Sequence, residues 1–138
     1  MKNIKNKTLQ PCSFNPITGF HRDGYCRPNK LDFGKHLVCA RMNKKFLDFT
    51  EKRGNELRSV VKEGEKWCLC ENRYYEAYLA RKHPEIDENA THKSISSKTK
   101  KAIKKISKKK FNKKRKLTKK RKSNKKRKKT NINKKINE

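Results

Sequence analysis

Two short apolar runs stand out from an otherwise polar chain, and both predict β-strands. The first lies within residues 35–42, whose middle four residues are apolar without interruption. The second is Trp67-Cys68-Leu69-Cys70. Side chains alternate between the two faces of a strand, so the two cysteines would share one face and the tryptophan and leucine the other. Because both faces are apolar, we expect this strand to be covered on two sides.

One helix is predicted after each of these strands. Residues 44–53 carry apolar side chains at helical spacing, Asn43 can cap the first turn, and Gly54 suits the position after the last turn. Residues 73–82 repeat the pattern, with Asn72 as the cap and Pro84 enforcing the stop. The positions expected to face the core are Phe46, Leu47, Phe49 and Thr50 in the first helix and Tyr74, Tyr75, Tyr78 and Leu79 in the second.

The remaining segments are less regular. Residues 11–34 are rich in turn residues, and we expect the aromatic side chains among them to pin these loops onto the core. A short third strand is expected over residues 90–92, and residues 97–108 can form a very basic helix. The aromatic residues of the loops are Phe14, Phe20, Tyr25 and Phe33.

Charge divides the chain near Lys93. Residues 1–93 hold 19 Lys and Arg against 12 Asp and Glu, a net charge of +7, whereas residues 94–138 hold 23 against one, a net charge of +22. Apolar residues number 34 of 93 in the first part and 8 of 45 in the second. The sequence therefore predicts a small α+β domain over residues 1–95, with a short sheet and two or three helices. We expect a basic helix at its edge over residues 96–107 and a disordered Lys/Arg-rich tail over residues 108–138.

The N-terminal residues predict an intracellular protein. Residues 1–10 are polar and basic and lack the apolar run of a secretory signal, and no stretch has the ~20 apolar residues that span a membrane. We therefore expect the five cysteines to lie in a reducing compartment without a disulfide framework. In a eukaryotic host the basic tail would favour a nuclear or nucleic-acid-associated location.

Short motifs spread over residues 9–95 resemble domain of unknown function 2237, a small bacterial and plant family. The resemblance implies a compact α+β domain and brings no established activity or cofactor. Two departures stand out: the family has a longer loop after the Gly54-Asn55 position, and the basic tail after Ser107 has no family counterpart. The motifs are Cys12-Ser13, Asn15-Pro16, Thr18-Gly19-Phe20, Arg22-Asp23-Gly24, Cys26, Gly34, His36, Val38-Cys39-Ala40, Met42, Phe46-Leu47, Gly54-Asn55, Trp67-Cys68-Leu69-Cys70, Glu76-Ala77 and Ala90-Thr91-His92.

The cysteines and histidines leave the question of an enzyme open. Twelve residues separate Cys26 from Cys39 and 28 separate Cys39 from the next cysteine, so the chain has no Cys-x-x-Cys knuckle. Buried core cysteines without a metal or cofactor are the simpler interpretation. The alternative is a thiol- or metal-dependent enzyme, with a low-pKa thiol beside a histidine. Its site would draw on Cys68, Cys70, His36, His92, Asp23 and Arg22, although Asp23-Gly24 is also ordinary turn chemistry.

The tail carries the stronger functional signal. Residues 113–118, 119–124 and 125–130 are basic hexads, each beginning with Lys-Lys-Arg-Lys. Such clusters favour DNA or RNA over a membrane surface, because no apolar or aromatic face accompanies them. A tail that only raises solubility is the alternative. The residues predicted to bind nucleic acid are Lys113, Lys114, Arg115, Lys116, Lys119, Lys120, Arg121, Lys122, Lys125, Lys126, Arg127, Lys128 and Lys129.

Overall fold

Strand β1 (Val38–Arg41) is the centre of a three-stranded antiparallel sheet whose strand order is β2-β1-β3. The fold comes from a computed structural model that describes the backbone of residues 1–137 and the side chains of residues 1–121. Strand β2 (Lys66–Leu69) lies on one side of β1 and the two-residue β3 (Glu85–Ile86) on the other. The small α+β domain that the sequence predicts is confirmed.

The pairing of β1 with β2 places the two apolar runs opposite each other. Val38 faces Leu69, and Cys39 faces Cys68. These four side chains are almost completely buried. The prediction of strands covered on both faces is therefore confirmed for these positions.

The third strand lies earlier in the chain than the sequence indicates. Residues 88–90 form a short 3-10 helix, η1 (Glu88–Ala90), and the strand that pairs with β1 is Glu85–Ile86. The side chain of Asp87 accepts a hydrogen bond from the backbone N–H of Asn89, and the hydroxyl of Thr91 donates to the carbonyl of Asp87. These local bonds favour a turn over an extended strand at residues 88–91.

The first helix follows its predicted bounds closely, whereas the second begins earlier. Helix α1 (Lys44–Lys52) is capped by Asn43, whose side chain accepts from the Phe46 N–H at 2.8 Å. Helix α2 (Glu71–Leu79) begins two residues before the predicted start, because the Cys70 carbonyl already accepts from the Tyr74 N–H. Asn72 therefore lies inside the helix and does not cap it.

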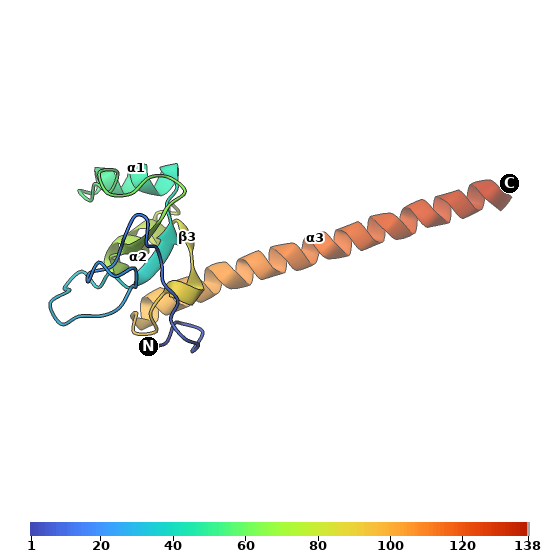
Figure 1. The fold of residues 1–138 in the computed structure, drawn as a ribbon. Helices are drawn as coiled ribbons and strands as arrows, with labels where there is room; N and C mark the ends of the chain where they lie inside the picture. The colour runs from blue at the N-terminus through green and yellow to red at the C-terminus, as the bar shows by residue number, and fades with distance from the viewer. Residues whose placement is uncertain (138) are drawn as a thin grey trace. The chain divides into compact units, whose positions relative to one another are not determined.

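The side chains that α2 buries also differ from the predicted set. Tyr74 and Ala77 are fully buried, while Leu79 is 65% exposed. The loop aromatics differ as well, since Phe14 and Phe33 are largely exposed and do not pin the loops onto the core. The light-blue segment before β1 forms a wide loop (Figure 1).

The N-terminal residues add a further layer to the domain. Asn3 forms an isolated antiparallel bridge with His92, and the Lys93 N–H donates to the Lys2 carbonyl. The buried Asn3 side chain also donates to the Asn89 carbonyl at 3.0 Å. The polar start of the chain is thus part of the fold.

Helix α3 (Ser97–Asn137) begins within the predicted edge helix and continues beyond it. The chain divides into two compact units, residues 1–102 and 103–138, and α3 contributes to both. The sequence predicts disorder over residues 108–138, whereas the structure gives a helical backbone as far as Asn137. Lys and Arg are good helix formers, and Gly and Pro do not occur between Ser97 and Asn137.

The far part of α3 exposes its side chains where these are described. Every side chain from Ser107 to Arg121 is exposed. An isolated helix of such charge density is marginal in water, because like charges one turn apart repel. Fast amide exchange from residue 108 onward in the free protein therefore stays a prediction. Among the described residues, no helix combines the length and the apolar character needed to cross a membrane.

Candidate functional site

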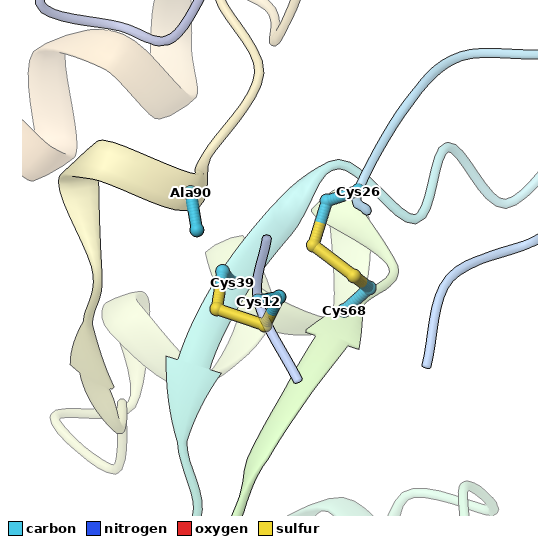
Figure 2. Packing of buried hydrophobic residues seen from close by; sticks show 5 residues of the cluster. All are labelled: Cys12, Cys26, Cys39, Cys68 and Ala90. Atoms are coloured by element: carbon cyan, nitrogen blue, oxygen red, sulfur yellow. A yellow bond between two sulfur atoms is a disulfide. The ribbon is translucent and has the colours of Figure 1, made fainter. Parts of the chain in front are cut away.

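Four cysteines form a buried cluster on one face of the sheet. Cys12 is bonded to Cys39 of β1, and Cys26 is bonded to Cys68 of β2. The two disulfides lie side by side, with Ala90 of η1 beside them (Figure 2). None of the four cysteines is more than 6% exposed. The cluster joins two strands to two loops that are distant in the sequence.

Hydrogen bonds fix the backbone of the two strand cysteines independently of the sulfur bonds. The Cys68 N–H donates to the hydroxyl of Thr18 at 2.9 Å, and the Cys39 N–H donates to the hydroxyl of Thr91 at 3.1 Å. Both N–H groups thus point away from the strand opposite. Cys39 and Cys68 therefore form a non-hydrogen-bonded pair, the arrangement in which facing side chains come closest.

The disulfides correct the predicted location of the protein. Stable disulfides form in oxidising compartments, so the expectation of an intracellular, reducing environment is wrong, and the nuclear alternative falls with it. The prediction failed because the bonded pairs are 27 and 42 residues apart, and only the fold brings them together. Burial of Cys39 and Cys68 was predicted correctly, but their state as free thiols was not.

Cys70 is the one free cysteine of the described chain, and it does not belong to the cluster. It is half-buried and occupies the N-cap position of α2, directly after strand β2 has ended. The expected alternation that would place Cys70 on the same face as Cys68 therefore does not apply, because the backbone turns into the helix.

His36 is held by a carboxylate in the wide loop before β1. Its Nδ1 lies 2.7 Å from Asp32 Oδ1, and its backbone N–H donates to Asp32 Oδ2 at 2.9 Å. The Asp32 side chain is 2% exposed and the His36 side chain 40% exposed. Gly34 packs against the imidazole, and a Cβ at that position would lie 2.7 Å from His36 Cε1. The ring is thus oriented by its surroundings and keeps one edge toward solvent.

Arg22 and Asp23 form hydrogen bonds within the turn that precedes Cys26. The Arg22 guanidinium lies 5.1 Å from the centre of the Trp67 ring, and its Nη1 donates to the Gly19 carbonyl. Asp23 accepts from the Tyr25 N–H and pairs with Arg27 at 2.7 Å. Partial burial raises the pKa of Asp23, but the Tyr25 hydrogen bond and Arg27 outweigh it and hold that pKa below its ordinary value.

His92 is a buried, neutral imidazole. Its Nδ1 accepts from the Ser94 N–H at 3.0 Å, so the neutral ring carries its proton on Nε2. Burial lowers the pKa of His92, and the positive charges of the chain N-terminus and Lys93 lower it further. Its backbone N–H donates to the Leu37 carbonyl, which ties this segment to the residue before β1.

A family model matches most of this chain. The model of an uncharacterised protein family conserved in bacteria, domain of unknown function 2237 (DUF2237), matches residues 2–109. The chain belongs to this family. The matched range is wider at both ends than residues 9–95, where the sequence motifs were found. It includes the N-terminal bridge to His92 and the start of α3. A comparison with curated proteins finds no match.

The DUF2237 domain does not gather its polar candidates into one site. Within residues 1–121, Arg22, Asp23, His36 and His92 each bind a different partner, and no hydrogen bond or ion pair joins any two of them. Cys68 is not a free thiol in this structure. What the fold does bring together is the four-sulfur cluster, which includes Cys12 and Cys26.

Sequence reasoning missed Glu71, which connects two helices of the DUF2237 domain. Its carboxylate accepts from the Ser96 N–H at 2.6 Å and from the Thr99 hydroxyl at 2.8 Å, at the start of α3. The residue is 3% exposed. Burial raises its pKa, but these hydrogen bonds outweigh burial and hold the pKa below its ordinary value. The sequence signal was present only as a Glu directly after a predicted strand.

Replacing Glu71 with Gln should destabilise the domain near neutral pH by about 1–3 kcal/mol, the usual effect of losing a buried charged hydrogen bond. Because the folded-state pKa is depressed, the ionised carboxylate stabilises the fold above its unfolded-state pKa, and this contribution disappears as the pH falls through the folded-state value. Urea unfolding of the parent chain and the Glu71→Gln variant at pH 7 and pH 3 measures the difference in their free energies of unfolding. This difference should be smaller at pH 3. The exposed Glu63→Gln is the matched control. A difference that does not depend on pH would contradict the assignment.

Proposed function

We propose that this DUF2237 protein binds nucleic acid through its basic C-terminal segment, without reading the base sequence. The observation that carries the proposal is the charge of residues 94–138, which hold 23 Lys and Arg against one acidic residue. A chain this basic attracts polyanions and displaces the counterions condensed on them.

The helical form of the segment supports the proposal. Four consecutive residues cover a full turn of an α-helix, so Lys113 to Lys116 present cations in every direction around the axis. A hexad rises about 9 Å, and each of the first two hexads holds four cations. This is one charge per roughly 2.3 Å, close to the phosphate charge of about one per 1.7 Å along duplex DNA.

The same side chains address phosphates and not bases. Lys ammonium groups are flexible point charges, which position a protein on the backbone without reading base edges. Phe111 is the only aromatic residue after residue 93, so stacking on single-stranded bases should contribute little. The side chains of Lys122 and of Lys125 to Lys129 lie outside the described residues, and their part in binding rests on the sequence alone.

Removing residues 108–138 should abolish most binding and leave the domain folded. The full chain and the shortened chain are titrated against two duplexes of unrelated sequence and one RNA of equal length. The full chain should bind both duplexes with similar affinity. Circular dichroism and urea unfolding check that the shortened chain keeps the fold of the domain.

A second comparison separates the position of the charges from their number. One variant replaces Lys113, Lys114, Arg115 and Lys116 with Gln, which keeps a good helix former at each position. Its matched control replaces four exposed lysines of the domain, Lys45, Lys52, Lys62 and Lys82, with Gln. The tail variant should lose much more affinity than the control. Equal losses, or a shortened chain that binds as well as the whole, would overturn the proposal in favour of a tail that only raises solubility.

A further inference from the structure

Three of the four buried cysteines have sulfur atoms close enough to bind a single metal ion, and the fourth is bonded to one of the three. The sulfur atoms of Cys12, Cys26 and Cys39 all lie within 4.8 Å of one another, and the fourth, Cys68, is bonded to Cys26. In a tetrahedral zinc site with Zn–S bonds near 2.3 Å, the sulfur atoms are about 3.8 Å apart. After reduction, the two bonded pairs would have to separate and the non-bonded pairs to draw closer to reach this spacing.

We propose that, when the two disulfides are reduced, these four cysteines form a tetrathiolate zinc site. Four thiolates in tetrahedral geometry are a ligand set typical of zinc, which has no redox chemistry of its own. The sequence spacing argued against such a site because no two of the four ligands are near neighbours. The fold supplies what the spacing lacks, since Cys39 and Cys68 face each other across β1 and β2.

Hydrogen bonds that involve no sulfur atom hold the backbone that carries the ligands in the folded domain. Thr91 and Thr18 bind the N–H groups of Cys39 and Cys68. The Cys12 N–H donates to the Gly24 carbonyl at 2.7 Å, two residues before Cys26, which keeps the two loop cysteines beside each other. Figure 2 shows the side chains from the loops and from the strands pointing toward one another. In the folded domain the four ligands therefore lie near their binding positions, and zinc binding would favour this folded state over the unfolded reduced chain.

The conversion balances with a dithiol as reductant. Each disulfide takes two electrons and two protons from one dithiol, which itself becomes a disulfide, and the two steps yield four thiols. Zn²⁺ then displaces the four thiol protons and leaves a site with a net charge of −2. Zinc affinity should consequently rise steeply with pH. The ion would replace both disulfides as the link between strands and loops.

Cys70 provides an internal control for this proposal. It is free and half-buried, and it occupies the N-cap position of α2 outside the cluster. A zinc site built by the cluster should leave Cys70 reactive. A site that instead used the Cys68-Leu69-Cys70 segment would protect Cys70 along with Cys68.

The test uses the full chain, reduced with a phosphine that carries no thiol, and then titrated with ZnCl₂. We expect one zinc per chain by native mass spectrometry, four protons released per zinc in weak buffer, and no binding by the oxidised protein. Alkylation followed by peptide mapping should modify all five cysteines without zinc and Cys70 alone with zinc. This readout needs no variant and so does not depend on a mutant that folds.

Variants add a second arm. Cys70→Ser should bind zinc like the parent chain, whereas Cys12→Ser should bind it more weakly by well over the roughly 10–100-fold that loss of an outer hydrogen-bond partner causes. Protection of Cys70, fewer than four protons per zinc, or no zinc retained by the reduced parent chain would each overturn the proposal.

Discussion

Raising the salt concentration from 50 to 200 mM should weaken binding of the full chain to duplex DNA by up to about 10⁵-fold. If about ten cations contact phosphates, the logarithm of the association constant should fall against the logarithm of salt with a slope of roughly −9. Residues 94–138 supply 23 cations, more than enough for this number of contacts. Fluorescence anisotropy at five or more salt concentrations measures the slope directly.

Replacing the cations of one hexad measures how much of the salt dependence that hexad contributes. Replacing the four cations of residues 113–116 with Gln should reduce the slope by about 3–4 if all four contact phosphates, since each contact contributes roughly 0.9. The domain variant with Lys45, Lys52, Lys62 and Lys82 replaced should keep the slope of the parent chain. Heparin, a polyanion without bases, should compete for the same segment. A nearly flat salt dependence would show that phosphate contacts do not drive binding.

Local signals predicted the elements whose folding depends on near neighbours. Asn43 and Gly54 bracket α1 as expected, because capping needs only a side chain and backbone groups within one turn. The apolar runs predicted β1 and β2 because a short strand covered on both faces needs apolar residues at every position. The start of α2 was placed two residues late, because Asn72 has the chemistry of a cap but the helix had already begun at Glu71.

Features that depend on distant segments could not be predicted in the same way. The pairing of Cys12 with Cys39 and of Cys26 with Cys68 follows from the β1–β2 register and from the path of the loops, neither of which the spacing of cysteines contains. The roles of Thr18 and Thr91 depend on the same register, because each hydroxyl binds the N–H of a strand cysteine. The sequence therefore assigned to one candidate site residues that bind different partners in the fold, and it missed the four-cysteine cluster.

The sulfur cluster also explains how so small a domain can keep long loops ordered. Residues 11–34 contain no helix or strand, and several of their large side chains are exposed. Burial of apolar surface therefore contributes little to fixing this segment. Covalent links at Cys12 and Cys26 tie both of its halves to the sheet and reduce the freedom of the unfolded chain.

Removing either disulfide should lower the free energy of unfolding by several kcal/mol. The bonds close segments of 27 and 42 residues, for which chain entropy predicts about 3.5 kcal/mol for Cys12–Cys39 and about 4 kcal/mol for Cys26–Cys68. Small domains typically have free energies of unfolding of about 5–15 kcal/mol, so losing one disulfide removes a large part of the stability. Losing both should leave the domain largely unfolded at 37 °C.

Paired alanine variants measure this loss without leaving an odd thiol in the core. Cys12→Ala with Cys39→Ala removes one bond, Cys26→Ala with Cys68→Ala removes the other, and Cys70→Ala is the control that touches neither. In urea unfolding without metal, the Cys26/Cys68 variant should have a lower free energy of unfolding than the Cys12/Cys39 variant, because its closed segment is longer. Both values should lie well below that of the control. The entropic effect acts on the unfolded chain, so the slope of free energy against urea should increase in both paired variants as their unfolded chains expand. Losses below about 1 kcal/mol in both paired variants would show that the disulfides do not hold this fold together.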